Sequence, residues 1–223
     1  KLSDDEDTMS KIRFTEPNRE ILARRDSIIN DLTRLVDPAG LITSTDECRA
    51  YETDALTAYR KMPLAVVLPK TTEEVSAVLK YCHDTGVKVV PRGAGTSLAG
   101  GAIPSEDAVV LGLSKMNRVL AVNYDDRFIR VEAGVTNLSV TAVVAENGFF
   151  YAPDPSSQLA CTIGGNIANN YGGAHCLKYG VTTNNLLGVR MVLIDGSIID
   201  LGGDYLDSAG LDLLGLVVGS EGQ

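Results

Sequence analysis

The chain has 223 residues, of which 44% are hydrophobic, and its formal net charge is −9. This apolar content supports one large or two small folded domains and argues against a disordered protein. The negative charge disfavours a nucleic-acid partner, and the sequence contains no run of eighteen apolar residues that would span a membrane.

The N-terminal part of the sequence changes from acidic to amphipathic. Residues 1–17 are expected to form an acidic mobile tail, and their first ten lack the apolar core of a signal peptide. Residues 18–60 are expected to form a helical segment, because the apolar residues between Ile21 and Val36 recur at helical spacing. The four cysteines form no CxxC pair, so the sequence predicts free thiols in a reducing cytoplasm and no metal site.

A strand, a helix and a second strand are predicted next. Residues 65–68 are apolar and flanked by prolines, and residues 87–90 form the second strand. Between them, Thr71 and Glu74 fit a capping box that opens a helix ending at Gly86. Because the second strand leads directly into a glycine-rich loop, that loop is expected at the carboxyl ends of the strands, where ligands bind in such sheets.

The rest of the chain is predicted to be mainly antiparallel. Strands are expected at 108–113, 118–123 and 127–133, a helix over 136–147, and a hairpin of strands 187–194 and 197–201 that turns at Asp195-Gly196. This change of pattern predicts two subdomains with a boundary somewhere within residues 102–115, taken as 61–107 and 108–223.

Two glycine-rich stretches carry most of the functional information. They run from Pro91 to Gly101 and from Thr162 to Gly173. Glycine has no Cβ, so its backbone N–H groups can converge on a phosphate or another anion. Two such cradles suit a ligand with two ends, such as a dinucleotide. The first stretch is not a Walker A loop, since no lysine follows its glycines, and Leu98 stands where the Rossmann fingerprint needs glycine.

These motifs resemble a known family. The run PRGAGTS at 91–97 resembles the pyrophosphate loop of the FAD-linked oxidases of the vanillyl-alcohol oxidase type, and residues 153–173 resemble their second flavin-contacting segment. HCLKYG at 175–180 and NLLG at 185–188 resemble the FAD subunit of glycolate oxidase and the related D-lactate and D-2-hydroxyglutarate dehydrogenases. The resemblance runs from Tyr51 onward. It implies an α+β fold, namely a PCMH-type FAD-binding domain of two α+β subdomains with an N-terminal helix.

The resemblance also implies which residues hold the cofactor. The implied FAD contacts are Pro91, Arg92, Gly93, Ala94, Gly95, Thr96, Ser97, Pro153, Asp154, Ser157, Thr162, Gly164, Gly165, Asn166, Ala168, Asn169, Gly172, Gly173, Glu221 and Gly222. Thr96 stands near the position of a histidine that several relatives join to the flavin, so non-covalent FAD is expected. Arg92 is interpreted either as a ligand-facing charge or as a solvated loop residue. Asn166 and Asn169 are interpreted either as amides facing the flavin ring or as capping and turn residues.

The implied activity of the complete protein is oxidation of a 2-hydroxy acid, of the glycolate or D-lactate type, by hydride transfer to flavin N5. An electron-acceptor subunit is among the expected partners. The alternatives are an FAD- or nucleotide-binding module of the UDP-sugar reductase branch and a non-catalytic binding module. Family members continue beyond the segment 219–222 into a substrate domain, so the chain is expected to be an N-terminal fragment that is inactive alone.

No catalytic residue is assigned from the sequence. His175 is the only histidine inside a motif, and two roles stay open for it. It either lies close to the flavin or substrate, or closes a loop through a hydrogen bond. The sequence shows no histidine–carboxylate cluster suited to deprotonating a substrate hydroxyl.

Overall fold

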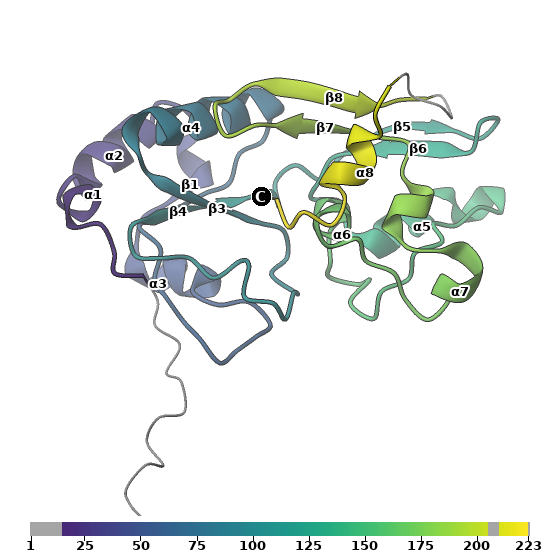
Figure 1. Cartoon of the computed structure of the whole chain (residues 1–223), viewed down its shortest axis with the longest axis horizontal. Helices are drawn as coiled ribbons and strands as arrows, with labels where there is room; N and C mark the ends of the chain where they lie inside the picture. The colour runs from purple at the N-terminus through teal and green to yellow at the C-terminus, as the bar shows by residue number, and fades with distance from the viewer. Residues whose placement is uncertain (1–14, 205–209, 223) are drawn as a thin grey trace, which may run out of the picture.

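The computed structural model describes residues 15–204 and 210–222, so most of the predicted acidic tail lies outside the described residues. Two regions lie side by side (Figure 1). The first holds a four-stranded sheet with helices against it, and the second holds two antiparallel hairpins with short helices. The mixed helix and sheet content confirms the predicted α+β class.

The sheet of the first region has the strand order β1-β2-β4-β3. It consists of β1 (Leu41–Ile42), β2 (Ala65–Val67), β4 (Ala108–Gly112) and β3 (Lys88–Arg92). The strands β2, β4 and β3 are parallel, and β1 is antiparallel to β2. Every residue of β2 and β4 is buried, as expected for central strands of a parallel sheet.

The position of β4 narrows the predicted range for the subdomain boundary. The helix α4 (Thr72–Thr85) joins β2 to β3, and β4 then enters the sheet between these two strands. A boundary at residue 108 would therefore separate β4 from the sheet to which it belongs. A boundary after Gly112 fits the sheet better, because β5 begins the antiparallel part of the chain.

The N-terminal helical segment contains two helices where a single one is predicted. These are α1 (Arg19–Ala23) and α2 (Arg25–Leu32). Between them the N–H group of Arg24 donates to the Ile21 carbonyl at 3.1 Å, which tightens the turn and interrupts the helix. The short elements η1 (Pro38–Gly40), α3 (Thr45–Cys48) and η2 (Arg49–Tyr51) follow.

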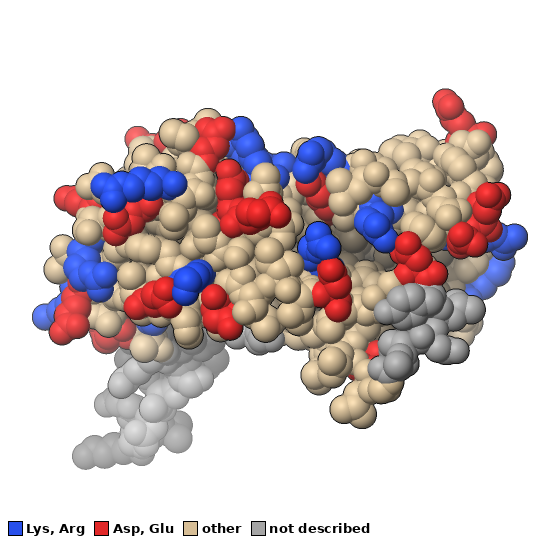
Figure 2. Space-filling model, turned by 90° about the horizontal axis from the view of Figure 1, so that it is seen from above, with Lys and Arg blue, Asp and Glu red and all other residues tan. Residues whose placement is uncertain are grey.

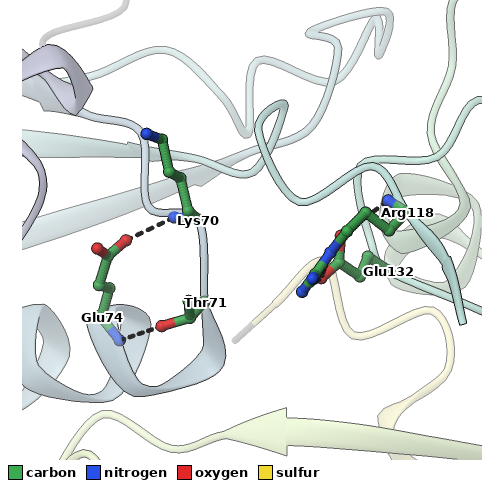
Figure 3. A network of polar contacts seen from close by, with 5 residues as sticks. All are labelled: Lys70, Thr71, Glu74, Arg118 and Glu132. Carbon is green, nitrogen blue, oxygen red and sulfur yellow. Dashed lines mark hydrogen bonds and ion pairs between the residues drawn. The ribbon is translucent and has the colours of Figure 1, made fainter.

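The start of α4 largely follows the predicted capping box. Thr71 Oγ1 accepts the N–H of Glu74 at 3.2 Å, as predicted. The Glu74 carboxylate reaches one residue further back than expected and accepts the N–H of Lys70 at 2.6 Å (Figure 3). Gly86 ends the helix at φ +73°.

The second region is built from short elements. They are β5 (Val119–Asn123), β6 (Phe128–Val131), α5 (Asn137–Val144), η3 (Ala145–Asn147), α6 (Ile163–Asn169), α7 (Cys176–Tyr179), η4 (Thr182–Asn185), β7 (Gly188–Val192), β8 (Ile198–Gly202) and α8 (Leu213–Val217). The pairs β5–β6 and β7–β8 are antiparallel. Arg118 precedes β5 and Glu132 follows β6. Arg118 Nη2 donates to Oε1 of the buried Glu132 at 2.7 Å (Figure 3). This ion pair lowers the pKa of Glu132.

The β7–β8 hairpin connects the two regions. It lies over α4 in Figure 1, and its turn contains Asp195-Gly196 as predicted. The strands are shorter than predicted at the turn, because Leu193 and Ser197 already belong to it. Ser76 of α4 donates its hydroxyl to the Gly196 carbonyl at 2.5 Å, so the turn is fixed to the first region.

The described surface is mixed in charge. Acidic and basic side chains alternate over the described part of the face shown in Figure 2. In the described part of the chain, no helix has both the length and the apolar character needed to cross a membrane.

Candidate functional site

The segments predicted to hold the cofactor meet where the two regions face each other. A Cβ on Gly93 would lie 2.7 Å from Thr162 Oγ1, so the first glycine loop packs on the start of α6. A Cβ on Gly222 would lie 3.3 Å from Pro91 Cγ, so the C-terminal segment 219–222 also touches this loop. Residues that are distant in sequence therefore lie in contact here.

The first glycine loop presents unpaired backbone donors. Within residues 15–204 and 210–222, no group accepts a hydrogen bond from the N–H groups of residues 93–98. Gly95 adopts φ +70°, a left-handed conformation that glycine reaches without strain. Its carbonyl accepts the N–H of Ala55 at 3.0 Å, which anchors the loop. Consecutive N–H groups without a protein acceptor form a cradle suited to a phosphate.

Hydroxyl groups supplement this cradle. Thr96 and Ser97 are half-buried within the loop, and Ser97 Oγ accepts the N–H of Ala99 at 3.2 Å. This bond leaves the Ser97 hydroxyl hydrogen available as a donor. The residues at 93–98 therefore fit the pyrophosphate of FAD through N–H and O–H groups.

Arg92 is turned into the protein, which differs from both interpretations offered by the sequence. Its Nη1 donates to the Thr53 carbonyl at 2.8 Å, and its guanidinium lies 5.6 Å from the centre of the Tyr51 ring. Burial lowers the pKa of Arg92, and the negative charge of Asp54 partly opposes this. Arg92 thus ties residues 51–54 to the glycine loop. Sequence reasoning missed these residues, which carry no glycine or motif signal.

The second glycine segment forms the first turn of α6, and its N–H groups are used inside the protein. The N–H of Ile163 donates to the Val135 carbonyl and that of Gly164 to the Ala133 carbonyl, both at 2.9 Å. Thr162 caps the helix by accepting the N–H of Gly165 at 3.4 Å. The start of α6 is therefore not a second anion cradle.

The glycines of this segment allow close packing within the protein. A Cβ on Gly164 would lie 2.8 Å from the Ala133 Cβ. One on Gly172 would overlap Cys176 Sγ, and one on Gly173 would overlap the Asp154 carbonyl. At these three glycines, protein atoms fill the space that a side chain would need.

The two asparagines of α6 also differ from the prediction that their amides face a flavin. Asn166 is completely buried, and neither of its amide atoms has a hydrogen-bond partner in the described part of the protein. Asn169 Nδ2 donates to the Gly165 carbonyl at 3.0 Å, so this amide supports the helix itself. The alternative interpretation, a local role in the helix, is the better one for Asn169.

The remaining predicted residues make backbone contacts or are exposed. Pro153 is buried, and its carbonyl accepts Asn137 Nδ2 at 3.0 Å. The Ser157 carbonyl accepts the N–H of Ala160 at 2.8 Å. The Ala168 carbonyl at the end of α6 accepts the N–H of Glu221 at 2.7 Å. Ala94, Glu221 and Gly222 are exposed.

The structure also brings together two residues that the sequence does not connect. His175 Nδ1 lies 2.5 Å from Asp154 Oδ2, although the two residues are 21 positions apart. The hydrogen bond to His175 lowers the pKa of Asp154. The sequence does not reveal this pair, because its two residues come together only in the folded chain. Of the two roles left open for His175, a hydrogen bond that closes the loop is present.

Comparison with known proteins identifies the family to which this site belongs. A family model described as "FAD binding domain" matches residues 63–202, which is more than half of the chain. The chain belongs to this family of FAD-binding domains, as its glycine motifs predict.

Individual relatives agree with this assignment. The chain is 49% identical over 198 residues to the glycolate oxidase subunit GlcD of Escherichia coli, covering 89% of this chain and 40% of the relative. It is 40% identical over 198 residues to a D-lactate dehydrogenase of Archaeoglobus fulgidus, covering 88% of this chain and 44% of the relative. The chain thus spans less than half the length of these curated relatives.

A solved structure confirms the fold. Alkyldihydroxyacetonephosphate synthase superposes with a TM-score of 0.79 over 95% of this chain and 39% of that one, at 21% identity. At this low identity the likeness concerns the fold alone.

Proposed function

We propose that this chain is the FAD-binding portion of an oxidoreductase that oxidises a 2-hydroxy acid of the glycolate or D-lactate type. The observation that carries the proposal is the loop at 93–98, whose N–H groups have no acceptor in the described part of the protein. Membership of the FAD-binding domain family identifies the cofactor. The relatives that oxidise glycolate or D-lactate by name support the substrate class.

The cofactor is proposed to be held without a covalent bond. Thr96 stands near the position of the histidine that links to the flavin in covalent relatives, and an alkyl hydroxyl group is a much weaker nucleophile than an imidazole. The protein's contribution is to bind and orient the flavin and to limit access of water, while the flavin itself accepts the hydride. The four cysteines are free thiols, which supports the proposed cytoplasmic location. An electron-acceptor subunit is proposed as a partner.

The first experiment tests the cofactor. Purified protein is reconstituted with FAD, passed over a desalting column and examined by absorption spectroscopy. Retention of the two flavin absorption bands is expected, and acid precipitation is expected to release all of the yellow colour. A colourless protein would contradict FAD binding, and colour that stays in the pellet would contradict the non-covalent mode.

The second experiment tests the substrate class. Protein expressed from the complete gene is mixed anaerobically with glycolate, D-lactate or a UDP-sugar substrate. Bleaching of the flavin by a 2-hydroxy acid is expected. Reoxidation of reduced flavin by the UDP-sugar substrate would instead favour the UDP-sugar reductase branch, and no response to any of them would favour a non-catalytic binding module.

A further inference from the structure

The Arg92 guanidinium packs against the first glycine loop from within the protein. Arg92 is the last residue of β3, and its carbonyl accepts the N–H of Leu113 at 3.1 Å, so its backbone is fixed by the sheet. A Cβ on Gly95 would overlap Arg92 Nη2 and would lie 3.0 Å from Nη1. The guanidinium therefore occupies the space beside Gly95, and its position determines how much room this part of the loop has.

Residues 52–61, which we call the clamp loop, reach the same glycine loop from another part of the chain. The N–H of Ala55 donates to the Gly95 carbonyl at 3.0 Å. A Cβ on Gly100 would lie 3.5 Å from Leu56 Cδ2, so the clamp loop also contacts the far end of the glycine loop. These two contacts hold the glycine loop on the side that faces the protein.

Asp54 places a buried carboxylate inside the clamp loop. The residue is only 4% exposed, and its Oδ1 accepts the N–H of Leu56 at 2.9 Å. Its Oδ2 is buried and has no hydrogen-bond partner in the part of the chain that the structure describes. Burying a carboxylate costs free energy unless a positive charge nearby compensates for it. Arg92 carries such a charge. Burial lowers the pKa of Arg92, and the negative charge of Asp54 opposes this lowering.

We infer that Asp54 is a positioning residue for FAD, because its charge keeps the Arg92 guanidinium against Gly95. Arg92 Nη1 in turn donates to the Thr53 carbonyl at 2.8 Å, so the clamp loop and the glycine loop are held as one unit. The N–H groups of residues 93–98 then keep the conformation that suits a phosphate before the cofactor arrives, and less conformational freedom is lost on binding. This inference rests on the proposed role of residues 93–98 in FAD binding and is independent of the substrate.

Two opposing effects are expected when the charge of Asp54 is removed. The buried guanidinium loses its compensating charge, which favours its release from Gly95 and a disordered cradle. The phosphates of FAD also lose a repelling negative charge, which favours binding. The first effect is expected to be larger, because the guanidinium touches the loop directly, whereas Asp54 reaches it through Arg92 and the clamp loop.

The first test measures the clamp loop without any ligand. Protein expressed from the complete gene is freed of FAD, and hydrogen–deuterium exchange is followed by mass spectrometry in the peptide that contains Ala55. Asp54→Asn and Arg92→Lys are both expected to speed this exchange, because the Ala55 N–H is released from the Gly95 carbonyl.

The matched control is Asp107→Asn. Asp107 is also buried, at 1% exposed, and pairs with Lys88 Nζ at 2.8 Å. Lys88 begins β3 and Arg92 ends it, so this carboxylate lies at the opposite end of the strand from the glycine loop. Asp107→Asn should lower the urea midpoint, and it should leave both the exchange at Ala55 and the FAD affinity unchanged.

The second test measures FAD affinity by isothermal titration of the same proteins. Asp54→Asn is expected to bind FAD about 10-fold more weakly, as for the loss of one buried charged contact. The double variant with Arg92→Lys is expected to lose about as much affinity as the weaker-binding single variant, because both substitutions act on one guanidinium.

The outcomes separate this inference from the proposed function. If wild type binds FAD and Asp54→Asn binds it equally or more tightly, the inference alone is wrong. It is also wrong if the two single losses multiply in the double variant, or if Asp107→Asn loses FAD affinity to the same extent. Should Asp54→Asn fail to fold, unchanged exchange at Ala55 in Arg92→Lys overturns the inference and faster exchange supports it. If wild type binds no FAD, the proposed function is wrong and the inference falls with it.

Discussion

The two glycine-rich segments are similar in composition and opposite in their structural use. The loop at 93–98 has N–H groups without a protein acceptor, and Gly95 holds a left-handed conformation. In the segment that begins at Thr162, the N–H groups of residues 163–165 are paired inside the protein. There the missing Cβ of Gly164 makes room for Ala133.

This difference shows that a glycine-rich motif does not by itself identify a ligand contact. In the first segment glycine frees backbone donors for a ligand, and in the second it permits one part of the protein to pack closely on another. Substitutions in the first segment should therefore affect FAD binding first, and those in the second should affect stability first.

The largest expected effect is that of Gly95→Val on FAD affinity. A branched side chain at φ +70° is strained, and its Cβ would overlap the Arg92 guanidinium, so the loop must rearrange. We expect FAD affinity to fall by about 100-fold or more, corresponding to roughly 3 kcal/mol. Isothermal titration with FAD measures this change.

The matched control for this substitution is Gly86→Val. Gly86 has φ +73° and no neighbouring atom within 4 Å of a Cβ, so the variant carries the same backbone strain away from the site. It should lose stability and keep its FAD affinity. Normal FAD affinity in Gly95→Val would remove the first loop from the site.

The next effect concerns the second segment. Gly164→Val should lower the free energy of unfolding by about 1–3 kcal/mol, because its side chain would be forced against Ala133. Urea denaturation without FAD measures the loss. Gly165→Ala is the control, since its Cβ meets only Thr162 Oγ1, at an ordinary contact distance of 3.4 Å. A Gly164→Val protein of normal stability that fails to bind FAD would show that this glycine faces the ligand.

Arg92→Lys tests whether Arg92 acts through charge or through its contacts. Lysine keeps the charge but cannot reproduce the planar guanidinium that binds the Thr53 carbonyl and lies beside the Tyr51 ring. We expect FAD affinity to fall by about 5- to 10-fold, as for the loss of one or two hydrogen bonds. Arg190→Lys, in an exposed ion pair, should change nothing in the same titration. Unchanged FAD affinity in Arg92→Lys would instead support the interpretation that Arg92 acts as a ligand-facing charge.

The smallest expected effect is a pH dependence of the free energy of unfolding, caused by a carboxyl group near the second glycine-rich segment. Glu132 precedes Ala133, and its pKa is lowered by the hydrogen bond from Arg118. A carboxyl group with a lowered folded-state pKa stabilises the protein above its unfolded pKa, and this contribution is lost as the pH falls through the folded value. The urea midpoint of wild type should exceed that of Glu132→Gln at pH 7. This difference should shrink when the pH falls below 4.5, the ordinary pKa of a glutamate side chain. A constant difference would contradict this linkage.

Local features of the fold were predictable from the sequence. The cap at Thr71, the stop at Gly86 and the turn at Asp195-Gly196 each depend on residues that are adjacent in the chain. The position of β4 was not predictable in this way, because an apolar strand carries no signal that tells which neighbours it will pair with. The interruption of the helix at Arg24 was not predicted, because the apolar residues on both sides of it keep helical spacing.

The sequence by itself determined the family and the cofactor class, and it predicted where an anion cradle lies, because glycine motifs act through the backbone of consecutive residues. Only the tertiary structure decided which glycines pack against other parts of the protein, since this depends on atoms from Ala133 and Asp154. It also paired Asp154 with His175 and turned Arg92 inward. Such contacts join distant parts of the chain, and packing alone sets the distance between them.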